Sequence, residues 1–152
     1  MNENSRAAGP ATPGRLTRRR YKNDFMTTAE LIMRRFNPNG LIGEDERGRV
    51  CLIEDCVDDP SDGRIYRIEI VATPDGRHAL AYCRYNPWGA LNGGEEYQTG
   101  HVDSSGFLCL GPDHRGKDVE SSPYELSFVI KRARYWCTAF SVLKETGEFP
   151  NL

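Results

Sequence analysis

The sequence has no long hydrophobic run. None of its apolar stretches approaches the roughly 18 residues that a helix needs to cross a bilayer. Its first residues also lack the apolar core of a secretory signal peptide. We therefore expect a protein of the cytoplasm with no membrane partner.

The sequence also has little net charge. Its 20 Lys and Arg residues nearly balance its 22 Asp and Glu residues, which gives a net charge of -2 with His neutral and a pI of about 5.9. Such a balance provides no overall attraction to nucleic acid or to an anionic membrane. We therefore expect no nucleic-acid partner, and any electrostatic partner has to meet a local patch.

Paired cysteine motifs are missing as well. The chain has five cysteines, an odd number, and contains no Cys-x-x-Cys pair; Cys51 and Cys56 are separated by four residues. A disulfide framework needs paired cysteines, and a structural zinc site needs close ligand pairs. We expect reduced thiols, no metal and no organic cofactor.

The composition divides the chain into a tail and one domain. A length of 152 residues, of which 38% are hydrophobic and 28% charged, suits a single globular domain. Residues 1–24 have almost no large apolar side chains and do not repay the entropy of ordering. The sequence predicts a flexible basic N-terminal tail over residues 1–24 and one domain over residues 25–152. The basic run from Arg15 to Lys22 is either solvated or a local binding patch.

The domain begins with a helix and continues with strands. Thr27 and Glu30 have the spacing of a capping box, and the Asn37 to Gly40 segment ends the helix. Turn-forming residues then separate runs with alternating apolar side chains. These runs predict three antiparallel strands, covered on one side: Arg49 to Val57, Arg64 to Ala72 and Arg77 to Tyr85.

A long amphipathic helix follows, and Gly147 ends it. Its apolar face closes the sheet, whereas Lys131, Arg132 and Arg134 lie mainly on the outer side. Together these elements predict an α+β fold, an antiparallel β-meander packed against helices. The residues of the apolar face recur at steps of three or four: Leu126, Val129, Ile130, Ala133, Cys137, Phe140 and Leu143.

The segment from Thr99 to Gly111 joins a polar turn to a thiol. Residues 103–106 are turn formers, and the apolar residues around Cys109 favour burial, so that Cys109 lies where the chain leaves the surface. His101 lies on the other side of the turn. A thiol that a histidine can approach is a candidate nucleophile, although a cysteine between leucines can also be an inert part of the core.

This segment resembles the active-site stretch of the E2 ubiquitin-conjugating enzymes. In that family a His-Pro-Asn element precedes a polar turn, a glycine lies three residues before the cysteine, and a leucine follows it. Gly106, Cys109 and Leu110 match that pattern in register, as does Leu108. Ser122-Pro123, followed by an amphipathic helix, matches the family's downstream region.

The departures from the family pattern indicate which members of the family the chain resembles most. His101 takes the place of the family's asparagine, Thr99 and Gly100 precede it, and no Trp precedes Ser122. With Gly-x-Leu-Cys-Leu around the cysteine, the chain is most similar to the stand-alone bacterial E2-like proteins of antiviral defence operons, of the CBASS or ubiquitin-like conjugation type. The resemblance covers residues 49–150 as a domain.

The resemblance implies an E2 (UBC-like) fold and a transferase. Cys109 would carry, as a thioester, the C-terminus of a ubiquitin-like protein or of a cyclic-oligonucleotide synthase (a cGAS-like CD-NTase), with an E1-like activating enzyme as a possible further partner. His101 would stabilise an oxyanion or act as a base towards the acceptor amine. His114 is a second candidate for that role, and Tyr97, Asp103 and Ser105 could shape the rim.

Two other functions stay open. A catalytically inactive binding module with the E2 fold is favoured by the departures at Thr99, Gly100 and Ser121. Another Cys/His enzyme, for acyl transfer or hydrolysis, would need an orienting Asn or Asp that the sequence does not identify.

Overall fold

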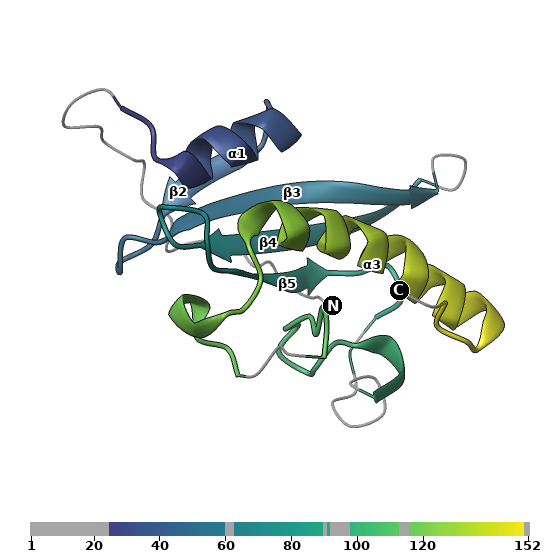
Figure 1. Ribbon diagram of the computed structural model, residues 1–152. Helices are drawn as coiled ribbons and strands as arrows, with labels where there is room; N and C mark the ends of the chain where they lie inside the picture. Colours follow the sequence, from purple (N-terminus) through teal and green to yellow (C-terminus); the bar gives the residue numbers. More distant parts are fainter. Residues whose placement is uncertain (1–24, 60–62, 90, 92–97, 113–115, 151–152) are drawn as a thin grey trace.

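The computed structural model describes residues 25–59, 63–89, 91, 98–112 and 116–150. Over these residues the chain has an α+β fold, in which helices pack on a four-stranded antiparallel sheet (Figure 1). No helix within the described ranges is long and apolar enough to cross a membrane. The elements are α1 (Thr28–Phe36), β2 (Leu41–Glu44), β3 (Val50–Asp59), β4 (Arg64–Ala72), β5 (Ala79–Tyr85), the 3-10 helix η1 (Val119–Ser121) and α3 (Leu126–Thr146).

The sheet is a meander with the order β2-β3-β4-β5, and each strand is antiparallel to the next. This confirms the predicted connection of three strands, of which β4 has the predicted bounds. The predicted number of three strands is wrong, because the sheet has a fourth strand, β2, that the sequence pattern does not indicate. Its four residues, Leu-Ile-Gly-Glu, show no alternating run; their pairing with β3, in the register Leu41↔Ile53, makes them a strand.

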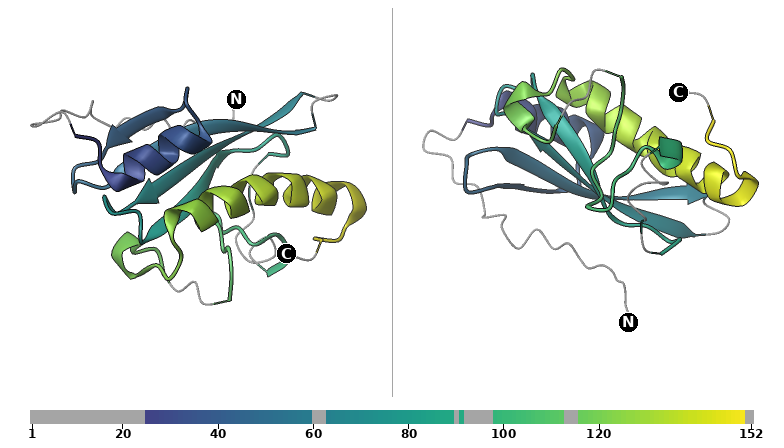
Figure 2. Two further views of the ribbon diagram at one scale, coloured as in Figure 1. Left: turned by 45° about the horizontal axis from the view of Figure 1, so that its top comes forward. Right: turned by 90° about the horizontal axis from the view of Figure 1, so that it is seen from below.

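Both main helices cover the same face of the sheet (Figure 2). The predicted cap of α1 is confirmed, since the Glu30 amide donates to Thr27 Oγ1 at 3.1 Å. The predicted end of α3 is also confirmed, because Gly147 has the left-handed φ of 87°. Six of the seven residues predicted for the apolar face of α3 are buried, whereas Leu143 is only partly buried. Trp136, Ala139 and Ser141 are buried as well. Trp136 stacks on Phe140 and meets Tyr66 edge to face.

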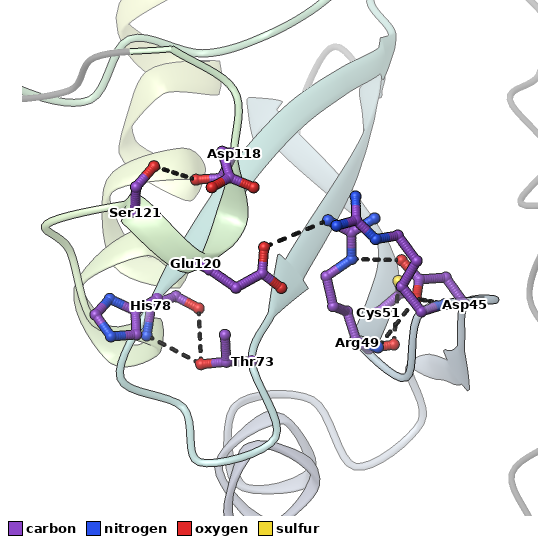
Figure 3. Close-up of polar contacts among 9 residues, drawn as sticks. Asp45, Arg49, Cys51, Thr73, His78, Asp118, Glu120 and Ser121 are labelled. Atoms are coloured by element: carbon purple, nitrogen blue, oxygen red, sulfur yellow. Dashed lines mark hydrogen bonds and ion pairs between the residues drawn. The ribbon is translucent and has the colours of Figure 1, made fainter.

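The opposite face of the sheet is partly covered too, which corrects the prediction of a sheet covered on one side. A second apolar cluster lies there, to which the segment after β5 contributes Phe107 and Val119. Figure 3 shows how η1 is tied to this side: Arg49 pairs with Asp45 at 2.9 Å and reaches Glu120 at 3.9 Å. The strands contribute Cys51, Val71 and Leu80 to the same cluster.

Arg134 does not lie on the outer side of α3, contrary to the prediction. Its guanidinium donates to both carboxylate oxygens of Glu54 at 2.8 Å, and to the Phe36 carbonyl at 3.0 Å. Asn37 donates to the same carboxylate at 3.0 Å. Burial raises the pKa of Glu54, but the hydrogen bonds from Arg134 and Asn37 outweigh burial, so that the net pKa lies below the ordinary value. The pair ties α1, β3 and α3 together.

We expect Arg134→Met to lower the free energy of unfolding at neutral pH by about 3–5 kcal/mol, because it leaves the buried Glu54 carboxylate without its positively charged partner. Arg67→Met is the matched control. Arg67 also makes two hydrogen bonds to a carboxylate, that of Asp55, but both side chains are exposed, and such pairs contribute about 0–1 kcal/mol. Urea titrations of the two variants measure the difference; equal losses would contradict the structural role of Arg134.

The pH dependence of this pair has a definite sign. The folded-state pKa of Glu54 is lowered, so the pair stabilises the fold fully above the unfolded pKa of about 4.3. That stabilisation is lost as the pH falls through the folded pKa. In Arg134→Met the carboxyl is left buried and its pKa rises, so acidification from neutral pH to about pH 5 should narrow the gap between variant and wild type. A gap of constant size would contradict this account.

Candidate active site

The candidate site is built on a small hairpin, residues 101–109. Val102 and Leu108 form an antiparallel bridge, and the Cys109 amide donates to the His101 carbonyl at 2.9 Å on the next rung. The predicted turn between them is organised by Asp103. The segment from Gln98 to Gly100 is helical and leads directly into the hairpin. The structure therefore brings together the two residues that the sequence selected, His101 and Cys109, through their backbones.

Asp103 holds the turn with both carboxylate oxygens. Its Oδ1 accepts from the amides of Ser105 at 2.8 Å and Phe107 at 3.0 Å, and its Oδ2 pairs with Lys117 Nζ at 2.7 Å. Burial raises the pKa of Asp103, but the hydrogen bonds from Lys117 and Ser105 outweigh it, and the net pKa is lowered. Asp103 is thus a charged organiser of the turn.

The second arm of the hairpin continues the sheet past β5. Leu108 donates its amide to the Ala81 carbonyl at 3.0 Å, and the Cys83 amide donates to the Gly106 carbonyl at 2.7 Å. Gly106 has a φ of 91°, and a Cβ there would collide with the Cys83 carbonyl oxygen. Only glycine lets the arm approach β5 this closely.

The alternation of side chains along this arm places Cys109. Phe107 packs in the second cluster, whereas Leu108 and Leu110 are in the main core. Because successive side chains of an extended segment point in opposite directions, Cys109 points away from the main core. Its thiol is partly exposed and lies 3.6 Å from the Gly111 carbonyl oxygen. The predicted position, where the chain leaves the surface, agrees with this structure.

Three of the other four thiols are unsuited to nucleophilic chemistry. Cys51, Cys83 and Cys137 are buried. Burial raises the pKa of Cys51 and Cys83 to about 12, and it raises the pKa of Cys137 as well. The thiolate is the reactive form of cysteine, so these three thiols are almost fully protonated at neutral pH. Figure 3 shows Cys51 beside Arg49, whose carbonyl oxygen is 3.9 Å from the sulfur.

Cys56 shares partial exposure with Cys109, so exposure alone does not single out Cys109 among the five thiols. Cys56 lies on β3, packs against the main core and donates to Glu54 Oε2 at 3.5 Å. Cys109 lies on a loop beside a histidine. The two differ in chemical surroundings rather than in exposure.

His101 has an unusual backbone and a shielded ring. Among the described residues it is the one non-glycine with a positive φ, 57°. Its ring meets Phe149 edge to face, with 4.7 Å between the centroids. Burial lowers the pKa of His101, so the imidazole is neutral at neutral pH and can accept a proton. Sequence reasoning missed Phe149; an apolar residue shortly after a helix-ending glycine is the signal that could have found it.

The other predicted site residues have different outcomes. Tyr97 and His114 lie outside the described residues, so their proposed roles stay predictions. Ser105 is exposed and donates to Asp103. Within the described ranges, no group of three or more His, Cys, Asp or Glu side chains could hold a metal ion. The chain matches no family model, no curated protein and no solved structure.

We expect a mild alkylating reagent to modify only Cys109 and Cys56 in the folded protein, because only these two thiols are partly exposed. Cys109 should react first, because Cys56 packs against the main core and donates to the Glu54 carboxylate, which disfavours its thiolate. Cys51, Cys83 and Cys137 should react only after unfolding. Peptide mass spectrometry over a time course measures each rate. Cys109→Ser should remove the fast phase, and a faster reaction at Cys56 in the wild type would show that the site is wrongly assigned.

Proposed function

We propose that this chain is an E2-like protein-conjugating enzyme with a UBC-like fold, in which Cys109 carries a protein C-terminus as a thioester. One observation carries the proposal: the hairpin presents the partly exposed Cys109 thiol outside the core, while Cys109 and His101 share a backbone hydrogen bond of 2.9 Å. The order of elements, a meander, then the cysteine loop, then a long helix, supports the same proposal.

Loading of Cys109 is an exchange between two thioesters. The Cys109 thiolate attacks the carbonyl carbon of the incoming thioester, and the thiolate of the previous carrier leaves. Even an unperturbed thiol is a few per cent ionised at neutral pH and is strongly nucleophilic. The step therefore needs an accessible sulfur and little further assistance.

Discharge needs more help, since an amine is the attacking group. The amine nitrogen forms a bond to the thioester carbon, the resulting oxyanion collapses, and the C–S bond to Cys109 breaks. A neutral His101 imidazole can accept the proton that the amine loses, or donate a hydrogen bond to the oxyanion. The lowered pKa of His101 keeps the ring neutral for the first of these roles.

The proposal includes the setting that the resemblance implies. The donor is the C-terminus of a ubiquitin-like protein or of a cyclic-oligonucleotide synthase, an E1-like enzyme supplies the activated thioester, and the reaction takes place in the cytoplasm during bacterial anti-phage defence. Both donors have the same chemistry at Cys109, a C-terminal carboxylate converted to an acyl group.

An inactive binding module with the same fold is the second candidate. It is favoured by the packing of the His101 ring on Phe149, which is also what a purely structural histidine would show. A stable non-covalent complex with a protein C-terminus, in the absence of any thioester, would support it.

The proposal is tested by coexpressing the tagged protein with the genes that adjoin its own and isolating it without reducing agent at mildly acidic pH. We expect an adduct that thiol reagents release and that Cys109→Ala abolishes. Cys109→Ser should retain a slower oxyester, because the hydroxyl has a similar reach and is a poorer nucleophile. Cys56→Ala is the matched control and should keep the adduct. An adduct that survives in Cys109→Ala would contradict the proposal.

His101→Ala should leave loading unchanged but slow discharge to a free amine by about 10²- to 10³-fold, as expected for loss of one oxyanion donor. His101→Asn should recover part of the rate, because an amide can donate to the oxyanion and asparagine tolerates the left-handed backbone at this position. Single-turnover discharge of preloaded protein measures both rates. Discharge of His101→Ala at the wild-type rate would transfer the role to another group, of which His114 is the next candidate.

A further inference from the structure

We propose that Phe149, on the segment that follows α3, is a positioning residue that seats the His101 ring in the site. Its effect on catalysis rests on the proposed function, whereas its effect on the ring can be measured without any donor. Phe149 lies 48 residues after His101 in the sequence, and their rings meet edge to face with 4.7 Å between centroids and 63° between planes.

The end of α3 is built to turn the chain back. The Gly147 amide donates to the Leu143 carbonyl at 2.7 Å, and the left-handed φ of Gly147 reverses the backbone. Thr146 Oγ1 donates to the Val142 carbonyl at 2.7 Å and accepts from the Glu148 amide at 3.3 Å. Figure 1 shows the chain turning back along α3 after its last turn. Phe149 is thereby packed against the main core rather than left in solvent.

The backbone next to His101 is fixed by α3 itself. Trp136 Nε1 donates to the Gly100 carbonyl at 2.7 Å, in a buried hydrogen bond. A Cβ at Gly100 would lie 2.8 Å from Phe140 Cε1, so this stretch packs tightly on the helix. Trp136 therefore fixes the backbone beside His101, and Phe149 contacts its ring. Within the hairpin, the His101 carbonyl accepts a hydrogen bond from the Cys109 amide.

Phe149 acts on the His101 ring by excluding water rather than by adding charge. Burial is the cause of the lowered pKa of His101. Of the charged groups close to the pair along the chain, Asp103 is ion-paired with Lys117 and Glu148 is exposed. On α3, Glu145 pairs with Arg64 and Lys144 lies over the Phe140 ring. A ring shielded on one side by Phe149 stays neutral and has fewer orientations available, both of which favour proton acceptance in a defined direction.

The structural part is tested by NMR titration of the His101 imidazole in the full-length protein, with no donor present. Phe149→Ala should raise the pKa of His101 towards the ordinary value of about 6.5, because it rehydrates the ring. Phe149→Tyr should keep the lowered pKa, and Phe149→Leu, which preserves most of the packing, should give an intermediate value. Phe128→Ala is the control: Phe128 lies at the other end of α3 and stacks on Tyr124.

An unchanged His101 pKa in both Phe149→Ala and Phe149→Leu would contradict the proposal that Phe149 shields the His101 ring. An equal pKa shift in Phe128→Ala would contradict it as well, because it would show that the domain as a whole had loosened. Because Phe149→Leu keeps an apolar side chain in the core, it preserves the test if Phe149→Ala fails to fold.

The catalytic part is tested by single-turnover discharge of preloaded protein. Phe149→Ala should slow discharge by roughly tenfold to 10²-fold while loading is unchanged, the cost expected when a reacting group is misplaced, and Phe149→Tyr should restore the rate. Wild-type discharge in Phe149→Ala would overturn the positioning role. A wild-type protein that forms no thioester would overturn the proposed function and the catalytic role together, whereas the titration would still decide whether Phe149 seats the ring.

Discussion

The backbone pairing between the hairpin at residues 101–109 and β5 is the interaction on which the rest of this site depends. An edge strand leaves a row of amide and carbonyl groups without partners inside its own sheet. Here the Leu108 amide and the Gly106 carbonyl satisfy two of those groups on β5. Once that register is set, Leu108 and Leu110 enter the main core and Cys109 is left between them, partly exposed.

The pairing of the hairpin with β5 also explains why packing on both faces of the sheet fixes the position of the site. The main core, with α1 and α3, lies on one face, and the second cluster, with Phe107 and Val119, lies on the other. A one-residue slip of the hairpin would exchange these faces and bury the thiol. The close approach at Gly106, which excludes any side chain, makes such a slip costly. The position of Cys109 is therefore a consequence of packing on two sides.

Much of the fold could be predicted because its signals are local. The cap at Thr27, the alternation along β4 and the helix end at Gly147 each depend on a few neighbouring residues. The errors concern long-range contacts. The short β2 is defined by its pairing with β3. Helical periodicity predicts Arg134 on the outer side of α3, whereas its ion pair with Glu54, 80 residues away in the chain, holds it towards the sheet.

The candidate site divides in the same way. The turn at Asp103 and the thiol at Cys109 form one short stretch, so the sequence could select them together. The Phe149 contact with His101 and the Trp136 hydrogen bond to Gly100 join segments far apart in the chain. The glycine that ends α3 indicates that an apolar residue after it packs on the domain, but no local pattern identifies His101 as its partner. The partial exposure of Cys56 is also a tertiary property, since its strand pattern is that of a core position.

The central claim, that Cys109 is the thiol that carries an acyl group, is tested most directly by incubating the folded protein with a small glycyl thioester. Intact and peptide mass spectrometry then locate the acyl group. The account predicts a single acylation at Cys109, reversed by added thiol and absent in Cys109→Ala. Acylation at Cys56 while Cys109 stays free, or no acylation of the folded protein at all, would contradict it.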